Sequence, residues 1–241
     1  MGGQTKLKAR QKEAEPSIAE QVKDIRANQC ARVLAFVEAA DLKFAKGDLE
    51  GAEELYRKAV AHPEWRAFGW LRPGASEADR HRAGESPEDF GSRKYLIPHA
   101  YTRIAEIVEK EGIPAQAQRV REKLQNSVAE IDAFKEAMKM KKAGDYELAR
   151  EFLDSALTHN PSSSQARLEL VRLDNLQGKT SAAALELDSL IGHDPQCVEA
   201  FALKIAISSK TGEPAEVRSA EKQVSNLFRR EHLKPIEIEA A

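Results

Sequence analysis

The sequence predicts an all-α protein, a right-handed α-solenoid in which antiparallel helix pairs stack in chain order. Three glycines recur at intervals of 34 residues, at Gly144, Gly178 and Gly212. Pro161 and Pro195 keep the same interval of 34 residues. Aromatic residues make up only 6% of the chain, and the residues that favour helices dominate it. A fixed period of this length indicates a repeat whose units bury their apolar faces by stacking.

Residues 130–161 show how one unit forms. Apolar positions recur at helical spacing up to Gly144, which can adopt the left-handed conformation that ends a helix. Asp145 follows as an N-cap for a second helix, and Pro161 stops that helix. The unit is therefore a helical hairpin with one exposed apolar side, and it needs neighbours on which to stack.

The units resemble the tetratricopeptide repeat family, whose motif sets small residues, a glycine, an aromatic residue or leucine, and a closing proline at fixed positions. The clearest copy consists of Ala137, Gly144, Ala149, Leu153, Ala156 and Pro161. The next copy consists of Val171, Gly178, Ala183, Leu187, Leu190 and Pro195. An earlier copy consists of Ala40, Gly47, Ala52, Tyr56, Ala59 and Pro63. Weaker copies span 97–128 and 198–231, so the resemblance implies about five repeats.

The organisation of the chain follows from these copies. Residues 1–16 are expected to form a disordered basic tail, because they are polar and charged. Residues 17–63 are expected to form a long helix, free of Gly and Pro up to position 45, and the first repeat. Residues 64–96 form an insertion rich in Trp and Arg. Residues 97–231 carry four further repeats, the last one capping, and residues 232–241 form a C-terminal tail.

Composition and motifs disfavour several classes of function. The net charge of −2 gives no field that would attract nucleic acid or an anionic membrane. No run approaches the ~20 apolar residues that cross a bilayer, and the basic start lacks the apolar stretch of a secretory signal. We expect a cytoplasmic protein without membrane insertion, although the sequence leaves an organellar address open. Cys30 and Cys197 are expected to be core residues without a disulfide.

Motifs of catalysis and of phosphate or metal binding are missing from the sequence. We therefore expect no catalytic residue, no cofactor and no small-molecule substrate. His62, His159 and His193 occupy equivalent places in three units, but stacked units lie too far apart for these side chains to share a metal. Each is expected at the C-terminal end of a helix, where the helix dipole favours a cation.

The first candidate site is the concave groove that the family resemblance implies along the first helices of the hairpins. The residues expected to face it are Phe134, Met138, Lys141, Leu168, Arg172 and Asn175. An apolar floor with Lys and Arg at its edge suits an amphipathic or acidic extended peptide. The alternative is that Phe134 and Met138 pack within the stack.

The second candidate site is the insertion. It contains Trp65, Arg66, Trp70 and Arg72, and Trp and Arg are enriched where binding energy is concentrated. The alternative is that the tryptophans cover the apolar side of the first hairpin.

The resemblance implies a non-catalytic adaptor or scaffold that binds a protein or peptide partner. One alternative is an assembly factor, a chaperone or a structural subunit of a larger complex. A second alternative is an enzyme whose site lies in the insertion, where Arg80, His81 and Arg82 would be the residues to test.

Overall fold

The computed structural model describes residues 16–61 and 96–233. Within these residues the chain forms nine α-helices and no strand, and consecutive helices pack against each other. The predicted all-α solenoid is confirmed. The helices are α1 (Ile18–Ala45), α2 (Leu49–Ala61), α6 (Leu96–Lys110), α7 (Pro114–Ala143), α8 (Tyr146–His159), α9 (Ser164–Leu176), α10 (Thr180–His193), α11 (Val198–Thr211) and α12 (Pro214–Leu233).

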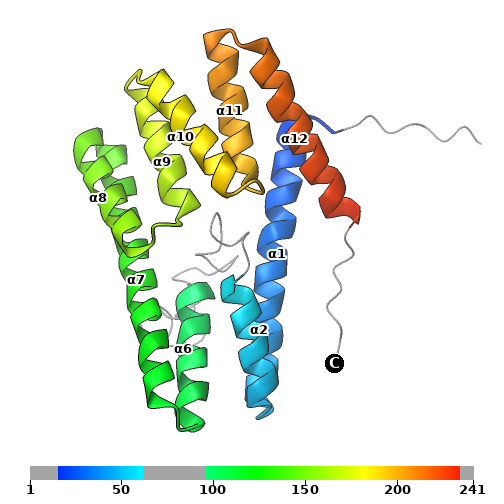
Figure 1. The fold of residues 1–241 in the computed structure, drawn as a ribbon, viewed down its shortest axis with the longest axis vertical. Coiled ribbons are helices and arrows are strands. Elements are labelled where there is room, and N and C mark those ends of the chain that lie inside the picture. The colour runs from blue at the N-terminus through cyan, green and yellow to red at the C-terminus, as the bar shows by residue number, and fades with distance from the viewer. Residues whose placement is uncertain (1–15, 62–95, 234–241) are drawn as a thin grey trace, which may run out of the picture.

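Two long helices join two groups of shorter ones (Figure 1). The lower group contains α2 and α6, and the upper group contains α8 to α12. Helices α1 and α7 have 28 and 30 residues and run along opposite sides of the molecule, from the lower group to the upper group. At 1.5 Å per residue each is about 42–45 Å long. The two long helices therefore connect the lower group to the upper group on opposite sides of the molecule.

The length of α1 follows from its cap and from its uninterrupted sequence. The Ser17 hydroxyl accepts a hydrogen bond from the Glu20 backbone N–H at 3.4 Å, and the Glu20 carboxylate accepts one from the Ser17 N–H at 2.8 Å. This reciprocal pair satisfies two N–H groups that a helix start leaves without partners. The long helix expected from the absence of Gly and Pro is confirmed.

Helix α7 also contains no glycine, and its only proline stands at its first position, where the missing N–H has no consequence. It runs without a break through residue 129, between the expected units 97–128 and 130–161. The second helix of one unit and the first helix of the next are therefore a single helix. Its first half packs on α6 and its second half on α8.

The turns within and between hairpins show the expected chemistry. Gly144 ends α7 with φ of 84°, the left-handed conformation that glycine adopts at little cost. The Asp145 carboxylate then accepts a hydrogen bond from the Leu148 N–H at 3.1 Å and caps α8. Both sequence predictions for this turn are confirmed.

The same contact recurs where one unit ends and the next begins. The Asn160 amide donates to Glu130 at 2.8 Å, and the Ser164 hydroxyl donates to Asp194 at 3.0 Å. Glu130 and Ser164 open consecutive units, and each partner closes the same unit 30 positions later. The repeat is therefore preserved in its contacts even though α7 runs through the first of these boundaries.

Four clusters of buried side chains form the core. The first holds α1, α2, α6 and the start of α7 together. The second and third join α7 to α11 in chain order, and Cys197 is buried in the third, as expected. The motif residues Ala137, Ala149, Leu153 and Ala156 have no exposed surface. No helix in the ranges 16–61 and 96–233 is long and apolar enough to span a membrane.

The fourth cluster closes the stack on itself. Ile25, in the first half of α1, is buried against α11 and α12 of the last hairpin. Each helix thus contacts its neighbour around a ring that ends where it began. The last hairpin does not leave its apolar side open to water, because α1 covers that side.

Candidate protein-binding surface

The two cations of the predicted groove converge on one carboxylate. Lys141 on α7 lies with its Nζ 2.6 Å from Oε2 of Glu169 on α9, and Arg172, one turn further along α9, pairs with the other oxygen. Glu169 is 6% exposed, whereas Lys141 and Arg172 are half-buried. The buried carboxylate thus fixes two positive groups at the surface where α7 and α9 meet. This pairing was not predicted from the sequence.

The row of charges continues onto α11 and α1. Glu199 of α11 lies with its Oε1 2.8 Å from Nε of Arg26 on α1. Burial raises the pKa of Glu199 to about 7, while Arg26 and Arg172 act to lower that pKa and Glu169 acts to raise it. The second oxygen of Glu199 is buried and accepts no hydrogen bond. Three cations and two carboxylates on α7, α9, α11 and α1 therefore influence one another.

The apolar members of the predicted groove lie deeper than expected. Phe134 and Met138 are half-buried and pack against the core cluster of α7, α8 and α9. Leu168 is 0% exposed within the cluster that joins α9, α10 and α11. It therefore lies in the core between these helices rather than at an exposed surface. Asn175 is half-buried near the end of α9.

The residues of the second candidate site lie outside the described part of the chain. This holds for Trp65, Arg66, Trp70 and Arg72, and for His62 and the Arg80–Arg82 segment. Their roles stay predictions. His159 and His193 end α8 and α10 and are exposed, and the described residues contain no cluster of three metal-ligating side chains.

Two pockets of the described structure lie away from the row of charges. A pocket of about 410 Å³ opens between the last turn of α10, the first half of α11 and α12. Its walls are Ile191, Pro195, Phe201, Lys204, Ser219, Ala220, Gln223, Asn226, Leu227 and Arg230. A pocket of about 250 Å³ lies where the lower group meets α7 and α8. Its walls are Val60, Tyr101, Lys123, Asn126, Ser127, Glu130, His159, Asn160 and Ser162. The predicted groove residues line neither of these two pockets.

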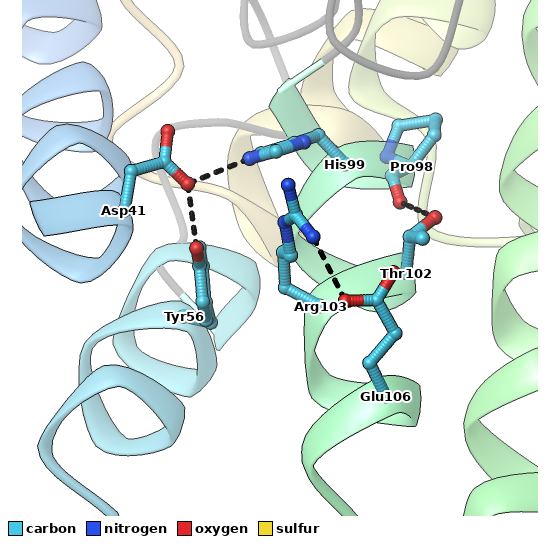
Figure 2. A network of polar contacts seen from close by, with 7 residues as sticks. All are labelled: Asp41, Tyr56, Pro98, His99, Thr102, Arg103 and Glu106. Atoms are coloured by element: carbon cyan, nitrogen blue, oxygen red, sulfur yellow. Dashed lines mark hydrogen bonds and ion pairs between the residues drawn. The ribbon is translucent and has the colours of Figure 1, made fainter. Parts of the chain in front are cut away.

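A polar network lies within the lower group, where Figure 2 shows Asp41, Tyr56 and His99 pointing toward one another. One Asp41 oxygen accepts a hydrogen bond from the Tyr56 hydroxyl at 2.5 Å and lies 2.8 Å from Nε2 of His99. Tyr56 is completely buried, and burial together with Asp41 raises the pKa of its hydroxyl. The hydroxyl therefore stays protonated, and the network joins α1, α2 and α6 rather than presenting a reactive group. The sequence marked Tyr56 only as a packing residue.

Helical hairpins that recur and stack in chain order define the protein as an α-solenoid repeat protein. A family model described as tetratricopeptide repeat matches residues 141–207. The part of the chain from the end of α7 into α11 is therefore similar to the tetratricopeptide repeat. A fold of this type supports, in general, a scaffold for interactions between proteins.

Two solved structures resemble the chain over most of its length. The structure of MamA protein is 15% identical, covers 87% of this chain and 97% of its own, and gives a TM-score of 0.39. The structure of YrrB, described as a TPR protein with an unusual peptide-binding site, is 13% identical, covers 89% of this chain and 93% of its own, and gives 0.33. With TM-scores under 0.5, neither likeness bears on the function of this chain. No curated protein matches the chain.

Proposed function

We propose that the protein is a non-catalytic scaffold that binds an extended, acidic segment of a partner protein on the surface formed by α7, α9 and α11. The observation that carries the proposal is the convergence of Lys141 and Arg172 on the buried Glu169. Glu169 carries one negative charge against the two cations that pair with it, so this set of ion pairs has a net positive charge. An acidic partner segment would supply the missing negative charge.

Position and preorganisation also support this surface. Phe134 and Met138 lie about two turns and one turn before Lys141 on the same helix, and both keep part of their apolar surface exposed. Because Glu169 already fixes the two cations, binding of a partner should cost little side-chain entropy at Lys141 and Arg172. An acidic segment with apolar residues at intervals fits both features.

Binding of short fluorescent peptides, followed by anisotropy, tests the proposal. The peptides alternate Glu with Leu, and a matched set alternates Lys with Leu. We expect the wild-type protein to prefer the acidic set, and the Lys141→Ala/Arg172→Ala variant to bind that set about tenfold more weakly, which corresponds to about 1.4 kcal/mol. Circular dichroism checks that both proteins are equally helical.

The control variant is Lys135→Ala/Lys139→Ala, which removes two exposed cations from another face of α7. It changes the net charge by the same amount but leaves the Glu169 cluster intact, so its binding should match the wild type. Equal losses in the two variants would reduce the effect to overall charge. A preference for the basic peptides would reject the proposed surface.

A further inference from the structure

The first half of α1, residues 18–32, is an amphipathic segment seated on the last hairpin. Ile18, Val22 and Ile25 follow one another at intervals of four and three positions, which places them on one face of the helix. That face packs on α11 and α12. The buried residues of the hairpin in this contact are Val198, Phe201, Ala220, Val224 and Leu227. We call this surface of α11 and α12 the seat.

Two buried carboxylates of the hairpin receive arginines from the same segment. Arg26 pairs with Glu199 at 2.8 Å, and Arg32 pairs with Glu231. The side chains of Glu199 and Glu231 are only 7% and 6% exposed. A buried carboxylate without a cation is costly, so this seat selects a helix that carries an apolar face and two correctly spaced cations. Residues 18–32 supply both.

The seat and the rest of α1 belong to different cores. Ile25 is buried in the cluster of α11 and α12, whereas Val33 and Val37 are buried in the cluster of the lower group. Arg32 and Glu231 are 199 positions apart, and no turn joins the segment directly to its seat. The contacts themselves therefore do not distinguish a segment of the same chain from the identical segment of another.

We propose that the face of α11 and α12 is an interaction surface for a second copy of this chain. In the exchanged form, residues 18–32 of each copy occupy the seat on the last hairpin of the other. Each seat keeps its apolar contact and its two ion pairs. The two copies are related by a two-fold axis. The ring of each copy opens at one place, between α1 and the last hairpin. Concentration sets the balance between the closed monomer and the exchanged dimer.

Charge reversal on the two sides of the contact tests the exchange. The segment variant is Arg26→Glu/Arg32→Glu, and the seat variant is Glu199→Arg/Glu231→Arg. Alone, each variant places like charges at both ion pairs. When the two are mixed, the segment of each matches the seat of the other. Size-exclusion chromatography with light scattering should therefore show a 1:1 heterodimer, whereas a mixture that stays monomeric overturns the proposal.

Two controls distinguish exchange of the segment from non-specific association. The chain with all four substitutions restores opposite charges within itself and should behave like the wild type. Reversal of the half-exposed pair of Arg121 and Glu109, as Arg121→Glu in one chain and Glu109→Arg in the other, lies outside the seat. Mixing these two chains should give no heterodimer, and a heterodimer here would also overturn the proposal.

A second measurement covers the case in which the seat variant does not fold. A labelled peptide of residues 16–33, with Cys30→Ser, is added to the segment variant, whose own seat is unchanged. We expect this peptide to bind at least about tenfold more tightly than the same peptide with Glu at positions 26 and 32. It should also bind more weakly to the wild type, where the segment already occupies the seat. Equal binding of the two peptides overturns the proposal.

Discussion

The middle of the stack and the contact that closes it are built from different kinds of interaction. From α7 to α10 the core consists of small and branched residues that recur at 34 positions, such as Ala149 with Ala183 and Leu153 with Leu187. The closing contact joins residues at opposite ends of the chain and relies on two arginine–carboxylate pairs as well as apolar packing. Periodicity therefore builds the hairpins, and a single long-range match builds the ring.

The largest effect should come from truncating core residues in the two regions. Leu153 and Ile25 are both 0% exposed, one in the middle of the stack and one in the closing contact. Leu153→Ala should lower the free energy of unfolding by about 2–5 kcal/mol. Ile25→Ala should lower it less, because the closing contact can open while the stack stays folded. Denaturant titration followed by circular dichroism measures both, and the reverse order would make the closing contact part of one cooperative unit.

The closing contact should also respond to pH through Glu199. Burial raises its pKa from 4.5 to about 7, so the folded state binds this proton more tightly than the unfolded state does. The contribution of Glu199 to stability therefore rises as the pH falls through 7 and is complete below 4.5.

A neutral replacement isolates that effect. Glu199→Gln should be about 1–3 kcal/mol more stable than the wild type at pH 8 and should lose this advantage at pH 5. Denaturant titration at the two values checks it, with Glu136→Gln at a surface ion pair as the control. A variant less stable than the wild type at both pH values would mean that the Arg26 pair outweighs the cost of burying the carboxylate.

Two glycines sharpen the comparison within the stack. Gly144 has φ of 84°, whereas Gly192 lies inside α10 with open space where a Cβ would stand. Gly144→Ala should cost about 1–2 kcal/mol because an L-residue is strained in the left-handed region. Gly192→Ala should stabilise the protein by about 0.5–1 kcal/mol. Thermal melting of the two variants should move in opposite directions, and a shared direction would contradict the role of Gly144 as the helix terminator.

The smallest loss of stability is expected in the lower group. Tyr56 occupies the motif position that Leu153 and Leu187 hold elsewhere, but its hydroxyl donates to Asp41. Tyr56→Phe should cost about 1 kcal/mol, because Asp41 keeps its contact with His99. Tyr146→Phe, at a half-buried tyrosine of α8, is the matched control. A much larger loss, measured by denaturant titration, would mean that the network, rather than apolar packing, holds α1, α2 and α6 together.

Local signals in the sequence predicted the hairpins, the left-handed Gly144, the Asp145 cap and the long helix α1, because each depends on neighbouring residues alone. The absence of Gly and of internal Pro predicted α1 as one long helix. The same absence in α7 did not lead to that prediction, because a boundary between two repeats was expected near residue 129. The pairing of Lys141 and Arg172 with Glu169 depends on how α9 is placed relative to α7, which periodicity does not specify. The burial of Leu168 depends in the same way on the packing of α10 and α11 against α9.

The closing contact was beyond sequence reasoning for a different reason. The spacing of Ile18, Val22 and Ile25 indicates an apolar face of α1, but nothing local indicates that their partners lie on the last hairpin. Such a contact is fixed only when every unit between the two ends has its final orientation.

The unbroken course of α7 constrains how the chain can change in evolution. One residue inserted near its middle would turn everything after it by about 100° and shift it by about 1.5 Å. The last hairpin would then lose its contact with residues 18–32 of α1, although every individual hairpin could still form. Insertions or deletions in α7 should therefore survive only in numbers close to whole helical turns, accompanied by a matching change in the length of α1.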